Sequence, residues 1–135
     1  MSPMARARVA LRRDTIARMR AALAAHPPRG AARVVLFGSL ARGDFDGASD
    51  ADLAVVSLGD EADAARLPTV DGAVHDAAGR PCDVLPVTAS DWRALMARAD
   101  PFAVALRREG IVLWESSAAA AAAPSAEPGG DGLAG

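Results

Sequence analysis

One stretch decides how this sequence is interpreted: residues 37–53, which read FGSLARGDFDGASDADL. Residues 33–37, which are apolar after Arg33, lead into it and predict a buried strand that closes at Gly38. Polar residues 39–49 follow, and Asp50 and Asp52 then lead into the apolar run at residues 52–56, which predicts a second buried strand. The acidic pair therefore lies at the beginning of one strand, and Gly38 lies at the end of another.

Asp50 and Asp52 are spaced to act together. Residues two apart on a strand share one face and lie about 6–7 Å apart along the chain. Two carboxylates so placed repel each other by about 1 kcal/mol or more in a partly wet site, and a bound cation would relieve that repulsion. Carboxylates without His or Cys suit a hard, oxygen-preferring ion. The pair therefore predicts a magnesium site.

Gly38 and Ser39 supply a complementary feature. Glycine lets the backbone approach a ligand closely, and Ser39 offers a hydroxyl and an N–H group where a helix is expected to start. Free N–H groups in that position suit a phosphate. Asp83, in the apolar run 82–87, adds a third carboxylate if its strand neighbours that of Asp52. A magnesium site beside a phosphate cradle is the arrangement of phosphoryl or nucleotidyl transfer.

Helices are expected around these strands. Residues 4–25 lack Gly and Pro and are expected to form a helix that ends before Pro27. Its apolar stripe follows a rough helical spacing through Val9, Leu11, Ile16, Met19 and Leu23. Weaker patterns predict short helices within residues 60–66 and 70–78.

The C-terminal half completes the predicted sheet. Residues 82–87 and 111–114 predict strands, the first at an edge because it contains Pro86. Between them, Ser90 is the expected N-cap of one helix, and Asp100 with Pro101 begins another that ends near Gly110. The predicted fold class is therefore α/β (α+β), with a small mixed β-sheet of three to four strands flanked by helices.

The expected domain organisation is simple. Residues 1–115 form one domain, in which the helix at about 4–25 precedes a catalytic core at about 33–115. Residues 116–135 are an Ala-, Gly- and Pro-rich tail with almost no large apolar side chain. Such a composition does not compensate the entropy lost on ordering, so we expect the tail to be disordered.

Composition and charge exclude several function classes. The net charge of −2 argues against direct nucleic-acid binding, which normally needs a basic excess. No apolar run approaches the roughly 20 residues of a membrane span, and the first residues resemble no signal peptide. The single Cys82 has no partner for an internal disulfide or a CxxC metal site. A cytoplasmic protein is therefore expected.

Gly38-Ser39, ten further residues and then Asp50-Ala51-Asp52 resemble the signature of the minimal nucleotidyltransferases, in the polymerase-beta-like superfamily. The resemblance spans about residues 33–115 and includes the flanking residues 41–43 and the late strand at 110–114. It implies that Asp50, Asp52 and Asp83 are catalytic carboxylates that hold Mg²⁺. It also implies that Gly38, Ser39 and Arg42 bind the nucleotide, ATP.

The resemblance further implies a reaction and a partner. A hydroxyl acceptor would attack the α-phosphate of ATP, and pyrophosphate would leave. Larger members carry an acceptor domain for which this chain has no length, and minimal members are the antitoxins of HEPN toxins. The expected acceptor is therefore a tyrosine of a HEPN-type toxin protein. Two alternatives stay open: an inactive antitoxin that acts by contact, and transfer to a small molecule such as an aminoglycoside. A homo- or hetero-oligomer also stays open.

Each candidate residue has a simpler interpretation. Asp50 and Asp52 would then be solvated turn residues, Asp83 an ordinary strand-end residue, and Arg42 a surface charge. A calcium loop at residues 44–55 is disfavoured, because Ser49 stands where that loop needs Gly and no late Glu follows. His26 and His75 are expected to be surface residues, and Cys82 a small buried apolar residue.

Overall fold

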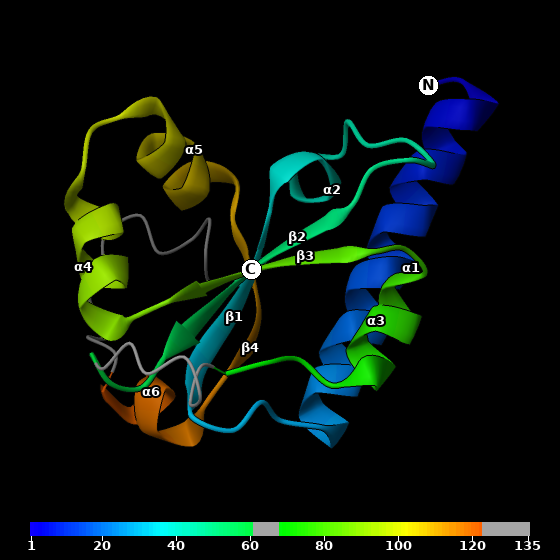
Figure 1. The fold of residues 1–135 in the computed structure, drawn as a ribbon. Coiled ribbons are helices and arrows are strands. Elements are labelled where there is room, and N and C mark those ends of the chain that lie inside the picture. Colours follow the sequence, from blue (N-terminus) through cyan, green and yellow to red (C-terminus); the bar gives the residue numbers. More distant parts are fainter. Residues whose placement is uncertain (61–67, 123–135) are drawn as a thin grey trace.

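The computed structural model describes residues 1–60 and 68–122, and the chain forms a four-stranded mixed sheet flanked by helices (Figure 1). The elements in chain order are α1 (Pro3–Ala25), β1 (Ala31–Phe37), α2 (Gly38–Arg42), β2 (Ala51–Ser57), α3 (Gly72–Ala78), β3 (Cys82–Val87), α4 (Ala89–Ala97), α5 (Pro101–Glu109), β4 (Ile111–Glu115) and α6 (Ser117–Ala122). The predicted fold class is confirmed.

The strand order is β3-β2-β1-β4. β1 is antiparallel to both β2 and β4, whereas β2 and β3 run parallel. Because β2 and β3 are parallel neighbours, both begin at the same end of the sheet. β3 lies at an edge, as its Pro86 predicts.

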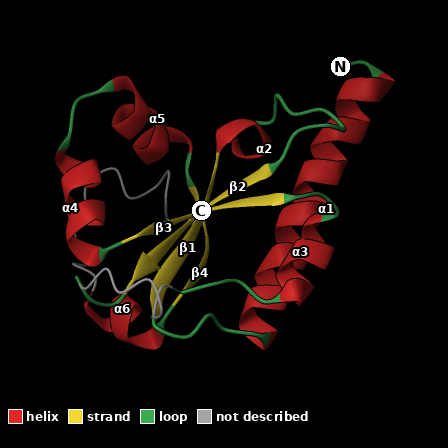
Figure 2. Ribbon diagram, viewed as in Figure 1, coloured by secondary structure: helices red, strands yellow, loops and turns green. Residues whose placement is uncertain are grey.

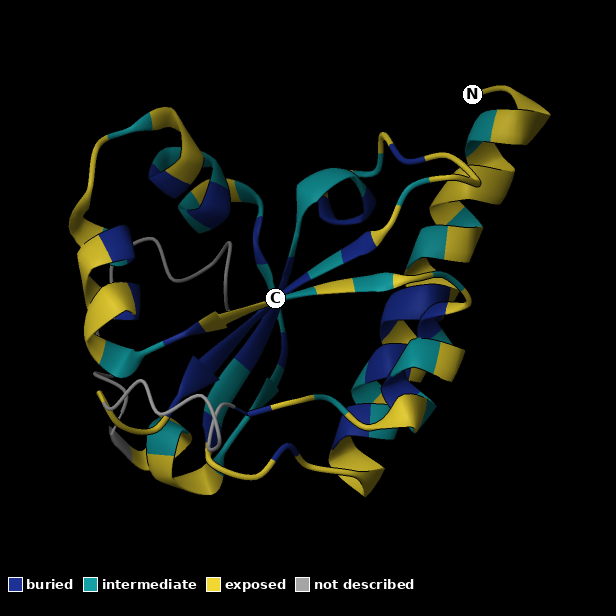
Figure 3. Ribbon diagram, viewed as in Figure 1, coloured by how far each residue is buried: buried dark blue, intermediate teal, exposed yellow. Residues whose placement is uncertain are grey.

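Helices cover both faces of the sheet, with α1 and α3 on one side and α4 and α5 on the other (Figure 2). Alternate residues of the strands separate into the two cores, since successive side chains point to opposite faces. Leu53 and Val55 pack with α1 and α3, whereas Ala54 and Val56 pack with α4 and α5. In Figure 3 the central strands are buried and the outer sides of the helices are exposed.

Helix α1 begins and ends as its sequence dictates. The Ser2 hydroxyl accepts a hydrogen bond from the Ala5 N–H (3.1 Å), and the helix ends before Pro27. The expected apolar stripe is wrong in its first half, where Val9 and Leu11 are exposed. The N-terminal turns extend beyond the sheet, so only the turns from Thr15 onward pack on it (Figure 1).

Capping residues fix where helices α4 and α5 begin. Asp100 caps α5 by accepting from the Ala103 N–H (3.3 Å), as predicted. The predicted Ser90 cap of α4 is wrong: Thr88 is the N-cap and accepts from the Asp91 N–H (3.1 Å). Both residues are good cap types, and the helix begins two residues earlier than expected.

Three other expectations are revised or fall outside the described chain. The helix expected at residues 70–78 begins at Gly72. The expected helix at residues 60–66 lies almost wholly outside the described residues, and so does the tail from residue 123. Residues 117–122 form α6 instead of a disordered segment. Alanine has the highest helix propensity, and the Ser116 hydroxyl accepts from the Ala119 N–H (3.0 Å).

Candidate active site

The site begins where β1 passes into α2. Gly38 has a φ of +78°, a conformation that disfavours residues with a Cβ. Phe37, just before it, is the register partner of Asp52 on β2. A Cβ built on Gly38 would collide with the Asp52 carboxylate and lie 3.1 Å from its Cγ. The Asp52 carboxylate therefore occupies the space that a side chain at residue 38 would need.

Three carboxylates gather at this end of the sheet. Asp52 and Asp83 are register partners on the parallel strands β2 and β3, and Asp50 precedes β2. Asp52 is half-buried, while Asp50 and Asp83 are exposed. Their strand positions match those of Ala54 and Val87, so Asp52 and Asp83 belong to the face that α4 and α5 cover. The strand of Asp83 therefore neighbours that of Asp52, which is the condition under which Asp83 adds a third carboxylate.

The electrostatics of Asp52 reflect this crowding. Burial raises the pKa of Asp52, the charges of Asp83 and then Asp50 raise it further, and Arg42 partly opposes the rise. An ionised carboxylate in this position is therefore less stable than one in water. A cation bound here would remove the penalty.

The donors fit magnesium by their chemistry. All three are carboxylates, which are hard oxygen ligands. Within residues 1–60 and 68–122, no three His, Cys, Asp or Glu side chains are already arranged to enclose an ion. Mg²⁺ does not need such a cage, because it keeps several waters and usually binds one or two carboxylates together with substrate phosphates. Asp50 and Asp52, with Asp83 beside them, fit that mode.

Arg42, the predicted nucleotide contact, is the last residue of α2 and pairs with two carboxylates. It forms ion pairs with Asp44 (3.2 Å) and with Glu109 of α5 (3.5 Å). The hydrogen bond to Asp44 raises the pKa of Arg42, and the charges of Asp44 and Glu109 add to the effect despite some desolvation. Arg42 therefore stays charged near Gly38, with its guanidinium engaged by two carboxylates.

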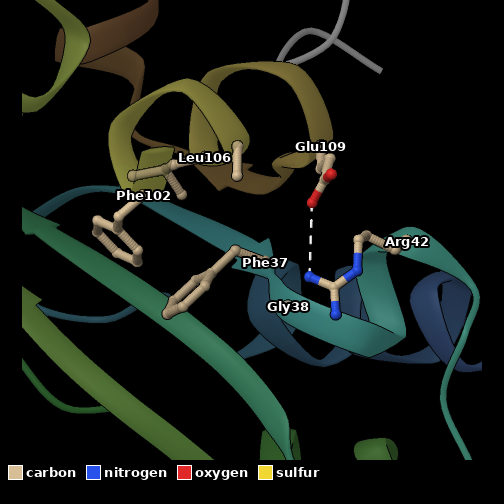
Figure 4. Close-up of a pocket in the computed structure, with 7 residues that line it drawn as sticks. Phe37, Gly38, Arg42, Phe102, Leu106 and Glu109 are labelled. Atoms are coloured by element: carbon tan, nitrogen blue, oxygen red, sulfur yellow. Dashed lines mark ion pairs between the residues drawn. The ribbon is translucent and has the colours of Figure 1, made fainter. Parts of the chain in front are cut away.

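A cavity of about 210 Å³ lies between α2 and α5, next to Gly38 (Figure 4). Phe37 and Phe102 line it with their rings edge to face at a centroid distance of 6.1 Å, and Leu106 and Ala105 extend the apolar wall. The Arg42–Glu109 ion pair lies at its other side. Sequence reasoning did not single out Phe102 or Glu109, because their place depends on how α5 packs over β1.

Arg12 is a third residue that sequence reasoning did not single out. It lies on α1, and its guanidinium donates to the carbonyls of Leu40 (3.0 Å) and Ala41 (2.6 Å) in α2. Helix C-terminal carbonyls lack partners within their own helix, so Arg12 satisfies two of them. It thereby fixes the short helix that carries Ser39.

Of the other candidate side chains, His75 lies on the opposite face of the sheet, whereas Cys82 directly precedes Asp83 on β3 but packs on the opposite face from it. His26 lies 3.9 Å from Asp71, and His75 is on α3 on the opposite face of the sheet. Cys82 is half-buried against the core, and burial raises the pKa of its thiol, so it remains a thiol at neutral pH. Among the described residues, no helix is both long and apolar enough to cross a bilayer.

The chain is similar to a solved structure and to a protein family. One similar solved structure is described as the crystal structure of a toxin-antitoxin with AMP-PNP; it shares 20% identity over 76% of this chain and 75% of that chain, with a TM-score of 0.44. No curated protein matches the sequence. The family described as nucleotidyltransferase domain matches residues 16–100, which include Gly38, the three carboxylates and the strands that carry them. The chain therefore belongs to the nucleotidyltransferase domain family.

Proposed function

We propose that this chain transfers AMP from Mg²⁺-bound ATP to a hydroxyl group. The observation that carries the proposal is the close approach of Gly38 to Asp52. It joins the expected phosphate-binding turn to the expected metal-binding strand, so that one ligand could contact both. The family match supports the same reaction class.

The residues have distinct roles in this proposal. Gly38 and Ser39 bind the triphosphate through main-chain N–H groups and the Ser39 hydroxyl. Asp50, Asp52 and Asp83 hold Mg²⁺, which when bound neutralises phosphate charge at the reacting α-phosphate. The raised pKa of Asp52 supports a cation-binding role, because a bound ion would stabilise a carboxylate that burial and the charges of Asp83 and Asp50 destabilise.

The reaction balances without a further reactant. The acceptor oxygen forms a bond to the α-phosphorus, and the bond from that phosphorus to the bridging oxygen breaks. Pyrophosphate leaves, and the acceptor proton passes to the exposed Asp83 carboxylate or to water. Arg42 contacts the triphosphate in this proposal only after it exchanges Glu109 for a phosphate oxygen.

We propose a tyrosine of a HEPN-type toxin as the acceptor, with the chain acting as an antitoxin in the cytoplasm. Asp50 and Asp83 are exposed, so a side chain on another protein could reach them. The chain itself contains no tyrosine. An AMP-tyrosine found in a complex would therefore belong to the partner.

The test is co-expression with a HEPN-type toxin, followed by mass spectrometry of the toxin. The proposal predicts that wild-type chain adds AMP to a toxin tyrosine and that Asp50→Ala or Asp52→Ala abolishes the addition. Ser39→Ala should reduce it less, because main-chain donors remain. Asp76→Asn is the matched control, since Asp76 is an exposed acid on α3, on the opposite face of the sheet.

The same experiment separates the two alternatives. If Asp50→Ala neutralises the toxin fully while transfer is lost, contact alone suffices. If the wild-type chain leaves the toxin unmodified but adenylylates a small hydroxyl compound such as an aminoglycoside, the chemistry holds and the partner assignment is wrong.

A further inference from the structure

The loop that leads into Asp50 has a defined internal structure. The Asp46 carboxylate accepts from the Ala48 N–H (2.8 Å), and the Ser49 hydroxyl accepts from the Asp46 N–H (3.0 Å). The Ser49 N–H donates to the Asp46 carbonyl (3.2 Å). These bonds close a turn, but all lie within residues 46–49. They do not attach the turn to the sheet.

Arg80, two residues before β3 begins at Cys82, makes that attachment. Its terminal nitrogen donates to the carbonyls of Asp46 (3.0 Å) and Ser49 (2.9 Å), which lie 34 and 31 residues earlier in the sequence. Its guanidinium also lies over the Phe45 ring, 5.1 Å from the centroid. Phe45 is buried in the core, so Arg80 ties the loop to a fixed point.

The next residue extends the attachment to β2. The Pro81 carbonyl accepts from the Ala51 N–H (2.9 Å), and Ala51 stands between Asp50 and Asp52. Arg80 and Pro81 therefore hold both ends of the Ser49–Ala51 segment. The backbone of Asp50 lies between these two points of attachment.

Arg80 occupies this place at a cost. Its Nε is buried without a hydrogen-bond partner, alone among the buried side-chain nitrogen and oxygen atoms of residues 1–60 and 68–122. An unsatisfied buried donor destabilises the folded state, because it loses its hydrogen bond to water without gaining another. The two hydrogen bonds to the loop and the contact with Phe45 hold the guanidinium in place despite that cost.

We propose that Arg80 is a positioning residue that sets the placement of Asp50 relative to Asp52. This inference rests on the proposed function, in which both carboxylates hold a divalent ion. Residues that orient metal ligands from behind change metal affinity or activity about 10–100-fold when they are replaced. Arg80 acts on the backbone carbonyls around Asp50 and not on its carboxylate.

The sign of the effect separates positioning from simple electrostatics. Loss of a positive charge beside the loop that leads into Asp50 strengthens cation binding by Coulomb attraction alone. Loss of positioning weakens it. Removal of Arg80 therefore gives opposite results under the two interpretations.

In the experiment, Mn²⁺ alone is titrated into each protein, and electron paramagnetic resonance measures how much of it is bound. The proteins are the wild-type chain, Arg80→Met, Arg80→Lys and Arg93→Met. Arg93 is the matched control, because it is exposed and pairs with Asp60 at 3.6 Å on the surface. We expect Arg80→Met to bind Mn²⁺ about 10–100-fold more weakly than wild type and Arg93→Met to bind it equally well. Arg80→Lys should fall between, because an ammonium can donate to both carbonyls but lacks the planar group over Phe45.

Hydrogen exchange in the same variants shows where the effect arises. The Ala48, Ser49 and Ala51 amides should exchange faster in Arg80→Met, while the amides of α1 stay protected. Arg80→Lys provides the comparison if Arg80→Met does not fold. Unchanged or tighter Mn²⁺ binding in a folded Arg80 variant would overturn the inference while leaving the proposed function intact. Failure of the wild-type chain to bind Mn²⁺ would overturn both.

Discussion

Gly38 and Asp52 share one space: the carboxylate of Asp52 fills the position that a side chain on residue 38 would occupy. The antiparallel register of β1 and β2, which pairs Phe37 with Asp52, brings the two residues together. The glycine therefore serves two purposes, because its positive φ turns the chain into α2 and its missing Cβ accommodates an acid.

Gly38→Ala should destabilise the fold more than a backbone effect alone. A non-glycine residue in the left-handed region costs about 1–2 kcal/mol, and the collision with Asp52 adds to it. Urea unfolding would measure the change in the free energy of unfolding.

Gly79→Ala is the matched control for this substitution. Gly79 also has a positive φ, +63°, but a Cβ there would have no atom within 4 Å. Gly79→Ala should lower the free energy of unfolding only by the cost of a non-glycine residue at a positive φ, about 1–2 kcal/mol. Equal losses in the two variants would show that the approach of Gly38 to Asp52 has no energetic consequence.

Asp52→Asn should stabilise the metal-free protein at neutral pH. The pKa of Asp52 is raised above its value in the unfolded chain, chiefly by burial, so ionisation destabilises the folded state. The penalty is fully present above the raised pKa and disappears as the pH falls towards the unfolded value of about 3.9. The variant should therefore have a higher melting temperature than wild type at pH 7, and the two melting temperatures should differ little at low pH.

The control for this pH profile is Asp76→Asn, which removes the same charge from an exposed position on α3. Thermal melts of the three proteins between pH 3 and 8 would give the comparison. A fall in stability of Asp52→Asn at pH 7 without metal would contradict the electrostatic account of the site.

Arg12→Met should loosen the junction between α1 and α2. It removes the hydrogen bonds to the Leu40 and Ala41 carbonyls, and bonds from a charged donor contribute about 1.5–3 kcal/mol. Arg13→Met is the comparison, since Arg13 is exposed and pairs with the neighbouring Asp14 on the same helix. Chemical denaturation should show a loss for Arg12→Met and almost none for Arg13→Met; similar values would mean that the α1–α2 contact is unimportant for stability.

The strands were predictable because each is a short apolar run bounded by polar or glycine residues. The continuous runs at residues 33–37 and 52–56 became the two central strands, which are buried on both faces. The spacing from Gly38 to Asp52 also predicted the family, because it is a local pattern within the single segment β1–α2–β2.

The contacts that hold the site together were not predictable in the same way. Arg12 reaches α2 across 28 residues of sequence, and Arg80 reaches the loop before Asp50 across 31. An arginine on a helix or before a strand carries no local signal for such a contact. The cavity beside Gly38 likewise depends on the packing of α5, which brings Phe102 to Phe37.

The most direct test of the central claim is isothermal titration calorimetry with α,β-methylene-ATP, an analogue that cannot release pyrophosphate, in the presence and absence of Mg²⁺. Wild type and Asp76→Asn should bind the analogue more tightly when Mg²⁺ is present, and Asp52→Asn should lose most of that gain because it lacks one of the proposed metal ligands. If wild type does not bind at millimolar concentrations, or if Mg²⁺ strengthens binding equally in Asp52→Asn, the carboxylates at this end of the sheet do not form a metal–nucleotide site.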